Sequence, residues 1–235
     1  MLIWAVWMSA ILASPNSEWA CVDGHTPMGR DGIARWCEDP ETQIKHGPWI
    51  RWYPDGQVWE EGSYLEGERH GLWTRYWRSG FPEIRYRYRK GLMQGLWTRT
   101  DETGNRVEEG RNVQNLRHGK WSQWHSNGEL MTHGRYLDGR KHGLWSEYSQ
   151  EGDRVASLQF ERGRLEGLTQ RWHEPETLAE KGSYYKGKRT GYWEFWEAGG
   201  RKDTARTGRY IDGQIVESLE ALEEALLGPS IEAIE

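Results

Sequence analysis

The sequence is poor in the residues that build ordinary globular cores. Hydrophobic residues make up only 36% of its 235 positions, and 3 Phe stand against 16 Trp, 11 Tyr and 29 Gly. This composition excludes a conventional core of Leu, Ile and Val. Trp and Tyr bury large areas and keep a polar group, so they can stabilise a surface that remains partly solvated. We therefore expect apolar contacts that are spread thinly along the chain.

The sequence also has no run of basic residues. Its net charge is −5, but residues 214–235 contain six Glu and no Lys or Arg, so the rest of the chain has a formal charge of +1. Arginines recur along this part with acidic residues between them. A nearly neutral chain without a basic stripe gives no electrostatic reason to expect nucleic-acid binding.

The one long uncharged segment, residues 2–13, is too short to span a bilayer. It is mostly apolar and is followed by Ser14 and Pro15, which resembles the apolar region and exit of a secretory signal peptide. No Lys or Arg precedes it, and Trp4 and Trp7 are bulky for such a region. We expect residues 1–20 to be a signal peptide and linker and the protein to be periplasmic or extracellular. Without a functional leader it would be cytoplasmic.

The sequence has only two cysteines, Cys21 and Cys37. Both lie between the leader and the repeats described below, and export would allow them to form a disulfide. Residues 21–45 are therefore expected to be an N-terminal cap. Lipidation of Cys21 is a less favoured alternative, because Glu18 and Trp19 depart from the lipoprotein pattern.

An internal repeat decides the fold. Seven glycines recur at intervals of 24 residues, and an aromatic residue follows two positions later in six of the seven units. The glycine column is Gly47, Gly71, Gly95, Gly119, Gly143, Gly167 and Gly191, and the tryptophan column is Trp49, Trp73, Trp97, Trp121, Trp145, Thr169 and Trp193.

Each unit contains two turn signals. Pro54-Asp55-Gly56 is typical of one and Glu66-Gly67 of the other, and the intervals between them leave room for strands of six to nine residues. Residues 46–213 are therefore predicted to form seven hairpins. The fold class is all-β, an elongated single-layer antiparallel meander of about fourteen strands with a short C-terminal helix.

One unit shows the repeat pattern in full: Tyr64, Gly67, His70-Gly71, Trp73, Tyr76 and Gly80 at fixed spacing. This pattern resembles the MORN repeat, specifically its bacterial variant, over roughly residues 46–213. The resemblance implies an elongated sheet of hairpins used for protein or membrane contact. Similar bacterial chains are commonly labelled antitoxin-like, although a leader peptide fits poorly with a cytoplasmic antitoxin. The third and sixth units depart from the pattern, the third at Thr100, Asp101, Asn112 and Asn115 and the sixth at Thr169 and Glu176.

Strand alternation places Trp49 and Trp52 on opposite faces of the sheet. Members of one column lie two strands apart, about 9.6 Å, so the tyrosines of the intervening strands must complete an aromatic ladder. Pairing about the Glu66-Gly67 turn sets Gly62 roughly opposite Gly71. A neighbouring indole can then lie across these glycines.

The acidic C-terminal segment, residues 214–235, contains apolar residues at helical spacing. Val216, Leu219, Leu222 and Leu226 precede Gly228-Pro229, which predicts a helix over 215–227. We expect it to cover the edge of the last strand, as repeat arrays need caps. Its acidic polar face does not favour a membrane.

No catalytic or cofactor-binding motif is present in the sequence. The histidines that precede the repeat glycines are too far apart to share a metal, and we assign them to turns. Adjacent glutamates such as Glu60-Glu61 point to opposite sides of a strand and cannot flank one bond. The sequence predicts no enzyme, no cofactor and no small-molecule substrate.

We expect a scaffold that binds a protein partner. The column that begins at Tyr53 varies between units while the tryptophan column does not, and variable positions can discriminate partners. The alternatives are a Trp-lined carbohydrate or choline binder at the cell surface and an antitoxin-like neutraliser of a toxin. The candidate partner-binding residues are Tyr53, Trp77, His125 and His173.

Overall fold

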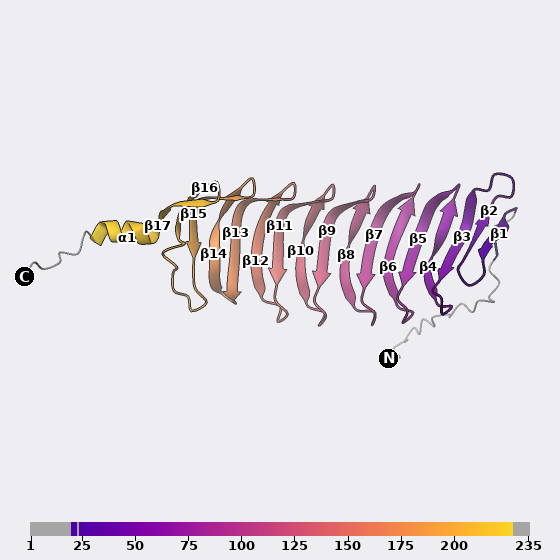
Figure 1. The fold of residues 1–235 in the computed structure, drawn as a ribbon, viewed down its shortest axis with the longest axis horizontal. Coiled ribbons are helices and arrows are strands. Elements are labelled where there is room, and N and C mark those ends of the chain that lie inside the picture. Colours follow the sequence, from indigo (N-terminus) through magenta and orange to yellow (C-terminus); the bar gives the residue numbers. More distant parts are fainter. Residues whose placement is uncertain (1–19, 23, 228–235) are drawn as a thin grey trace, which may run out of the picture.

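The computed structural model describes residues 20–22 and 24–227. In this part of the chain, 17 strands form one open antiparallel sheet in which each strand pairs with the next in sequence (Figure 1). The strands lie side by side along the long axis of the molecule. The predicted all-β meander with a short C-terminal helix is confirmed, whereas the proposed signal peptide lies outside the described residues, apart from Ala20.

An N-terminal hairpin, β1 (Thr26–Arg30) and β2 (Ala34–Glu38), precedes the repeats. The seven units supply fourteen strands, and β17 (Gln214–Ser218) and α1 (Leu219–Leu227) end the described chain. The repeat strands are β3 (Lys45–Trp52), β4 (Val58–Leu65), β5 (Glu68–Tyr76), β6 (Pro82–Arg89), β7 (Leu92–Thr100), β8 (Arg106–Val113), β9 (Leu116–Trp124), β10 (Leu130–Leu137), β11 (Arg140–Tyr148), β12 (Arg154–Glu161), β13 (Arg164–Glu174), β14 (Thr177–Tyr185), β15 (Lys188–Phe195) and β16 (Gly208–Ile211).

Two-residue turns form one edge of the sheet. Glu66 and Gly67 both have positive φ, 51° and 80°, as a type I′ hairpin turn requires. The amide of Gly67 also donates a hydrogen bond to the carbonyl of Lys45, the first residue of β3, at 2.8 Å. The same bond recurs at later turns, for example from Gly139 to Arg117. Consecutive hairpins are therefore joined at their turns as well as along their strands.

The glycine and tryptophan columns have a joint structural role. Gly71 has φ +73° in a β-bulge of β5, where the register with β4 shifts. Trp73 then lies flat over Gly62, so that a Cβ on Gly62 would be 2.2 Å from the indole. The Trp73 Nε1 donates to the carbonyl of Ser63. The predicted contact between an indole and a strand glycine is confirmed, and it recurs at Gly110 with Trp121, Gly134 with Trp145, and Gly182 with Trp193.

The indoles and tyrosines interleave into the predicted aromatic ladder. Trp145 lies edge-to-face between Tyr136 and Phe160, at centroid distances of 5.1 and 6.5 Å. A cation covers each indole that rests on glycine: Lys141 Nζ lies 4.2 Å from the Trp145 ring. Arg69, Arg117 and Arg189 do the same for Trp73, Trp121 and Trp193. We call this side of the sheet the tryptophan face.

In the sixth unit the large and small residues of the indole–glycine contact are exchanged. Leu158 stands where other units have glycine, and Thr169 stands where they have tryptophan; both are buried. Leu165 replaces the cation and packs on the same cluster. The small and large residues have exchanged strands, so the core is filled without an indole.

The third unit keeps both large residues. Tyr86 stands in the glycine position opposite Trp97. Trp97 is consequently less buried than Trp121 and leans on it, with ring centroids 5.3 Å apart. Of the departures noted in the sequence, only Thr169 lies at a position of the indole–glycine contact. Tyr86 was not among them, and the two units fill the contact in different ways.

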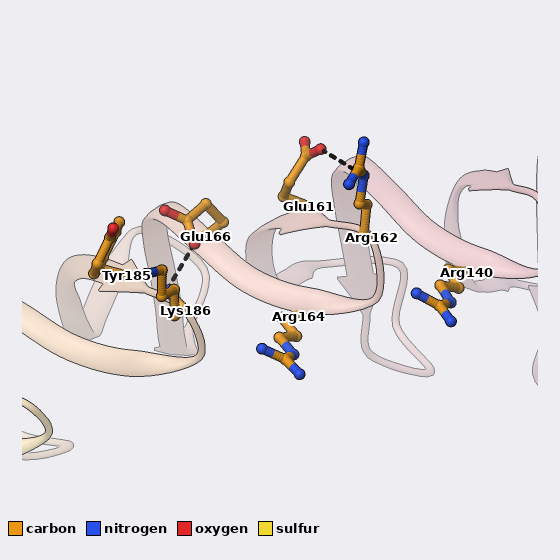
Figure 2. A pocket seen from close by; sticks show the side chains of 7 residues that line it. All are labelled: Arg140, Glu161, Arg162, Arg164, Glu166, Tyr185 and Lys186. Atoms are coloured by element: carbon orange, nitrogen blue, oxygen red, sulfur yellow. Dashed lines mark hydrogen bonds and ion pairs between the residues drawn. The ribbon is translucent and has the colours of Figure 1, made fainter.

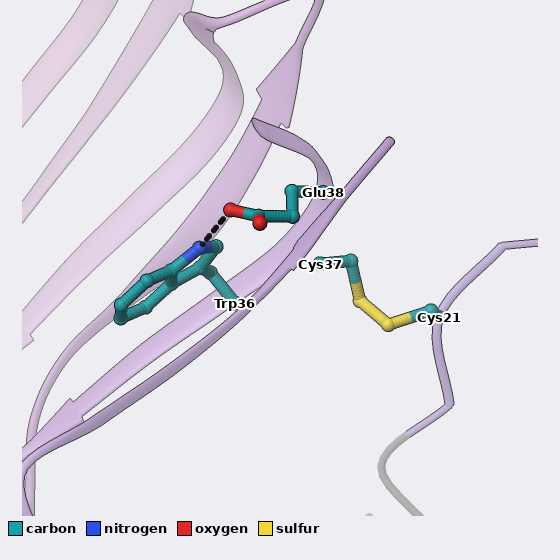
Figure 3. Close-up of a disulfide and its surroundings, with 4 residues drawn as sticks. All are labelled: Cys21, Trp36, Cys37 and Glu38. Atoms are coloured by element: carbon teal, nitrogen blue, oxygen red, sulfur yellow. Dashed lines mark hydrogen bonds between the residues drawn. A yellow bond between two sulfur atoms is a disulfide. The ribbon is translucent and has the colours of Figure 1, made fainter. Parts of the chain in front are cut away.

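The N-terminal cap contains the expected disulfide, Cys21–Cys37 (Figure 3). Cys37 lies in β2 and is fully buried, and the Val22 side chain lies near Gly47 of β3. The bond therefore fastens the start of the described chain against the first strands of the sheet.

The C-terminal end differs from the prediction. Residues 215–218 belong to β17, which pairs with β16, and the helix begins only at Leu219. It projects beyond β17 instead of covering it (Figure 1). Ile215 and Val216 satisfy strand pairing on the last hairpin, which a helical pattern read from the sequence alone could not reveal.

Candidate interaction surface

Three of the four candidate partner-binding residues, Tyr53, Trp77 and His125, directly follow strand ends, whereas His173 lies near the end of β13. We expected Tyr53 to continue a strand beside Trp49, but β3 ends at Trp52, and Tyr53 begins the five-residue loop before β4. Its hydroxyl donates to the carbonyl of Tyr76 in the next unit, at 2.8 Å. Equivalent bonds join Trp77 to Thr100, His125 to Tyr148, and His173 to Trp196. The structure thus gives this column a contact between adjacent loops, and partner binding by it stays a prediction.

The repeat histidines do not belong to turns, contrary to the expectation from the sequence. His70 lies within β5 and pairs with Ser63, directly before the bulge at Gly71. His118 approaches the carboxylate of Asp138 in a hairpin turn at 3.5 Å, and His142 approaches that of Glu161 at the end of β12 at 3.4 Å. Among the described residues, no group of three or more His, Cys, Asp or Glu is arranged to hold a metal ion.

The tryptophan face offers little free aromatic surface. Trp73, Trp121, Trp145 and Trp193 are each no more than 3% exposed. A hollow of about 240 Å³ lies between Trp121 and Trp145, bordered by Glu108 and Lys141. Burial lowers the pKa of Lys141, against the effect of nearby Glu147, and Glu108 is held by Arg117 at 3.1 Å. Most polar groups on this face are committed to contacts within the sheet.

Two phenols, the partly buried Tyr76 and the buried Tyr86, also form hydrogen bonds within the sheet. The hydroxyl of Tyr76 donates to Glu61 and that of Tyr86 to Glu60. Burial raises both pKa values, and the bonds to carboxylates raise them further. The folded state therefore favours the neutral phenol. This contribution to stability is fully present below about pH 10, the unfolded pKa, and is lost as the pH rises above it.

We expect the free energy of unfolding to fall above about pH 10 and to fall less steeply in a Tyr76→Phe/Tyr86→Phe variant. Urea unfolding between pH 8 and 11 measures this, with ultraviolet absorbance reporting phenolate formation. Identical slopes in the two proteins would contradict the assignment of the shifted phenols.

The opposite side of the sheet carries exposed leucines and arginines. Leu72 precedes Trp73, so alternation places it on the other face, where it is 47% exposed and pairs with Arg87. Leu96 pairs with Arg111 in the same way. We call this surface, from β5 to β11, the leucine–arginine face. Its other exposed apolar residues are Leu65, just before it, and Leu92, Val113, Leu116, Leu137 and Leu144.

This face is basic, although the sequence shows no basic stripe. Alternation gathers residues that lie far apart in sequence, with Glu68 and Glu109 as the only acids on these strands of the face, for a formal charge of +6. Apart from an Arg106–Glu109 contact, no ion pair is formed by its basic residues within the described chain. These are Arg85, Arg87, Arg89, Arg106, Arg111, Lys120, Arg135 and Arg140.

Basic residues also lie beside the two-residue turns, at the edge of the leucine–arginine face. Arg140 and Arg164 extend the same way from successive hairpins, away from the Glu161–Arg162 pair (Figure 2). With Tyr185 and Lys186 they border an open hollow of about 430 Å³. The described surface therefore combines exposed apolar groups with unpaired positive charge at this edge.

The family model described as MORN repeat variant matches residues 45–66 and 117–138. The chain is a MORN repeat protein. The two matched segments start at the same point of the unit, three units apart, and each covers two strands and the loop between them. No curated protein matches the chain significantly.

Within the MORN repeats, the sequence-based prediction missed the leucine–arginine face. Its signal was present: a leucine stands directly between glycine and tryptophan in four of seven units, at Leu72, Leu96 and Leu144 and, before threonine, at Leu168. The prediction rested on the recurring glycine and tryptophan and overlooked the residue between them. In the described part of this MORN repeat protein, no helix has the length and hydrophobicity needed to cross a membrane.

Proposed function

We propose that this MORN repeat protein is an exported, non-catalytic scaffold that binds an elongated protein partner on its leucine–arginine face. The observation that carries the proposal is the alternation of half-exposed leucines with unpaired arginines on one side of the sheet. Apolar groups exposed together are typical of interaction surfaces, and arginine is enriched at interfaces. Partner and scaffold would meet across several units, because each unit contributes only a few groups.

Export is supported by two features of the N-terminal part. The Cys21–Cys37 disulfide is typical of oxidising compartments. The apolar segment at residues 2–13 has the character of a secretory leader. The absence of a recognisable catalytic motif in the sequence supports the non-catalytic role.

The two alternatives have less support. A carbohydrate or choline binder needs accessible aromatic rings, whereas the ladder tryptophans are buried beneath cations and neighbouring rings. An antitoxin-like role rests on a family label, and the features that favour export argue against a cytoplasmic toxin partner.

A charge-reversal variant tests the proposed face. We expect Arg87→Glu/Arg111→Glu/Arg135→Glu to reduce partner capture from an extract of cells that express the protein, while the circular dichroism spectrum stays unchanged, because these side chains are exposed. The matched comparison is Tyr53→Ala/Trp77→Ala/His125→Ala, in the loop column. If capture fails only in the loop-column variant, the loops and not the leucine–arginine face bind the partner.

A further inference from the structure

The C-terminal helix is an apolar segment without a partner in the described chain. It projects beyond the last strand (Figure 1). Leu222 is 39% exposed and Leu226 is 87% exposed. Leu219, Leu222 and Leu226 form a stripe at helical spacing, with Glu220 and Glu223 to one side of it. This helix has nine residues, and isolated helices of that length have little stability in water. Packing of the leucine stripe against another surface would stabilise it.

The charge of this segment complements the leucine–arginine face. Residues 214–235 carry six Glu and no basic residue. The leucine–arginine face carries a formal charge of +6 between β5 and β11. Opposite potentials of this size favour encounter and orient the two surfaces.

The spacing of side chains also corresponds. Leu72 and Leu96 lie two strands apart, about 9.4 to 9.8 Å, with Arg87 on the strand between them. In α1, Leu219 and Leu226 are seven residues apart, which is about 10.5 Å along the helix. A helix that crosses the strands can therefore place these two leucines beside Leu72 and Leu96.

The acidic residues then meet the basic ones. Glu223 lies about midway between Leu219 and Leu226, as Arg87 lies midway between Leu72 and Leu96. One strand pair further, Leu96 and Arg111 continue the pattern, and Lys120 takes the place of the next leucine. The leucine–arginine face thus has a period that a helix of this composition can follow.

The helix cannot reach this part of its own sheet. β7 and β17 are ten strands apart, about 48 Å, whereas the helix is about 13.5 Å long and starts directly after β17. Resting on the function proposed above, we propose that the leucine–arginine face binds the C-terminal helix of a second copy of this chain. The protein would then assemble through a helix-on-sheet contact.

Sedimentation equilibrium of the full-length protein over a range of concentrations tests this association. We expect reversible self-association of the wild type. Leu222→Asp/Leu226→Asp and Arg87→Glu/Arg111→Glu should each weaken it about tenfold or more, because they remove the apolar and the ionic part of one contact. Arg30→Glu, an exposed change on β1, is the matched control and should leave association unchanged.

A charge swap separates a lost contact from a damaged fold. Glu220→Arg/Glu223→Arg combined with Arg87→Glu/Arg111→Glu should restore association that either pair of changes alone weakens. A wild type that remains monomeric at every concentration would overturn the proposal, as would a helix variant that associates normally. Binding of the monomer to anionic lipid vesicles in place of self-association would also overturn it.

These outcomes are distinct from failure of the proposed function. The wild type could be monomeric while Arg87→Glu/Arg111→Glu/Arg135→Glu still loses partner capture. In that case the leucine–arginine face binds another protein, and only the proposed self-association is wrong. If the triple arginine variant captures the partner normally and the double arginine variant associates normally, the proposed function itself is wrong.

Discussion

Replacing Gly134 with Leu should destabilise the centre of the sheet by about 3 to 5 kcal/mol. A Cβ at this position would lie 2.2 Å from the Trp145 indole, so the ring must leave its site and lose its burial. Trp145→Thr alone should cost a similar amount, because it leaves a cavity over Gly134. Urea unfolding and amide exchange of β10 to β12 measure both effects.

The double variant Gly134→Leu/Trp145→Thr should be more stable than the sum of the single changes by about 2 to 3 kcal/mol. It reproduces the natural pair Leu158 and Thr169 of the sixth unit. Adding Lys141→Leu, which corresponds to Leu165, should improve it further, since the cation no longer has an indole to cover. Gly199→Ala is the control: no atom beyond its chain neighbours lies within 4 Å of the place its methyl group would take, and we expect a loss of less than about 0.5 kcal/mol. Strict additivity of the two central changes would refute the size exchange.

The size exchange shows which information a repeated sequence contains. The spacing of Gly47, Trp49 and their equivalents was sufficient to predict hairpins, the meander and the indole–glycine contact. It also identified the third and sixth units as exceptions. The residues that face the tryptophan column in these units, Tyr86 and Leu158, lie on the adjacent strand 11 residues before that column. This pairing is defined only once the bulge at positions such as Gly71 is known. Register at a bulge depends on backbone geometry that no single residue type encodes.

The surface was harder to predict than the fold. Arg87, Arg111 and Arg135 are 24 residues apart and are interspersed with acids in the sequence, so they form no basic run. Alternation sends Glu60 and Glu108 to the tryptophan face, where Arg69 and Arg117 neutralise them. Arg87, Arg111 and Arg135 lie on the other face and form no ion pair within the described residues. A count of charges along the chain combines the tryptophan face and the leucine–arginine face, so it does not show that only the second has a large net positive charge.

The loop column has a structural contact that its sequence variation did not indicate. Variation at Tyr53, Trp77 and His125 suggested a recognition surface, but these side chains share one function in the structure, a hydrogen bond to a carbonyl of the next unit. A phenol, an indole and an imidazole can all supply that bond. Variation in residue type therefore does not distinguish recognition from a contact that several side chains can make.

Breaking the disulfide should destabilise the N-terminal cap by about 3 kcal/mol on the loop-entropy estimate. Cys21 and Cys37 are 16 residues apart in sequence, and the bond holds the described start of the chain beside β2 and β3 (Figure 3). In Cys21→Ser/Cys37→Ser the segment near Val22 loses its covalent attachment. A hydroxyl also replaces a sulfur position that is fully buried. We expect faster amide exchange in β1, β2 and β3.

The effect should remain local, because each unit of a repeat array contacts only its neighbours. Amides of β9 to β12 should exchange as in the wild type, and the reductant-treated wild type should behave like the serine variant. Reductant added to the serine variant is the control and should change nothing. The outcome that would sink this account is exchange in β2 and β3 that is the same with and without the bond. Backbone pairing alone, including the register that sets Trp36 opposite Trp49, would then hold the β1–β2 hairpin on the first repeat strand, and the disulfide would protect only the segment before β1.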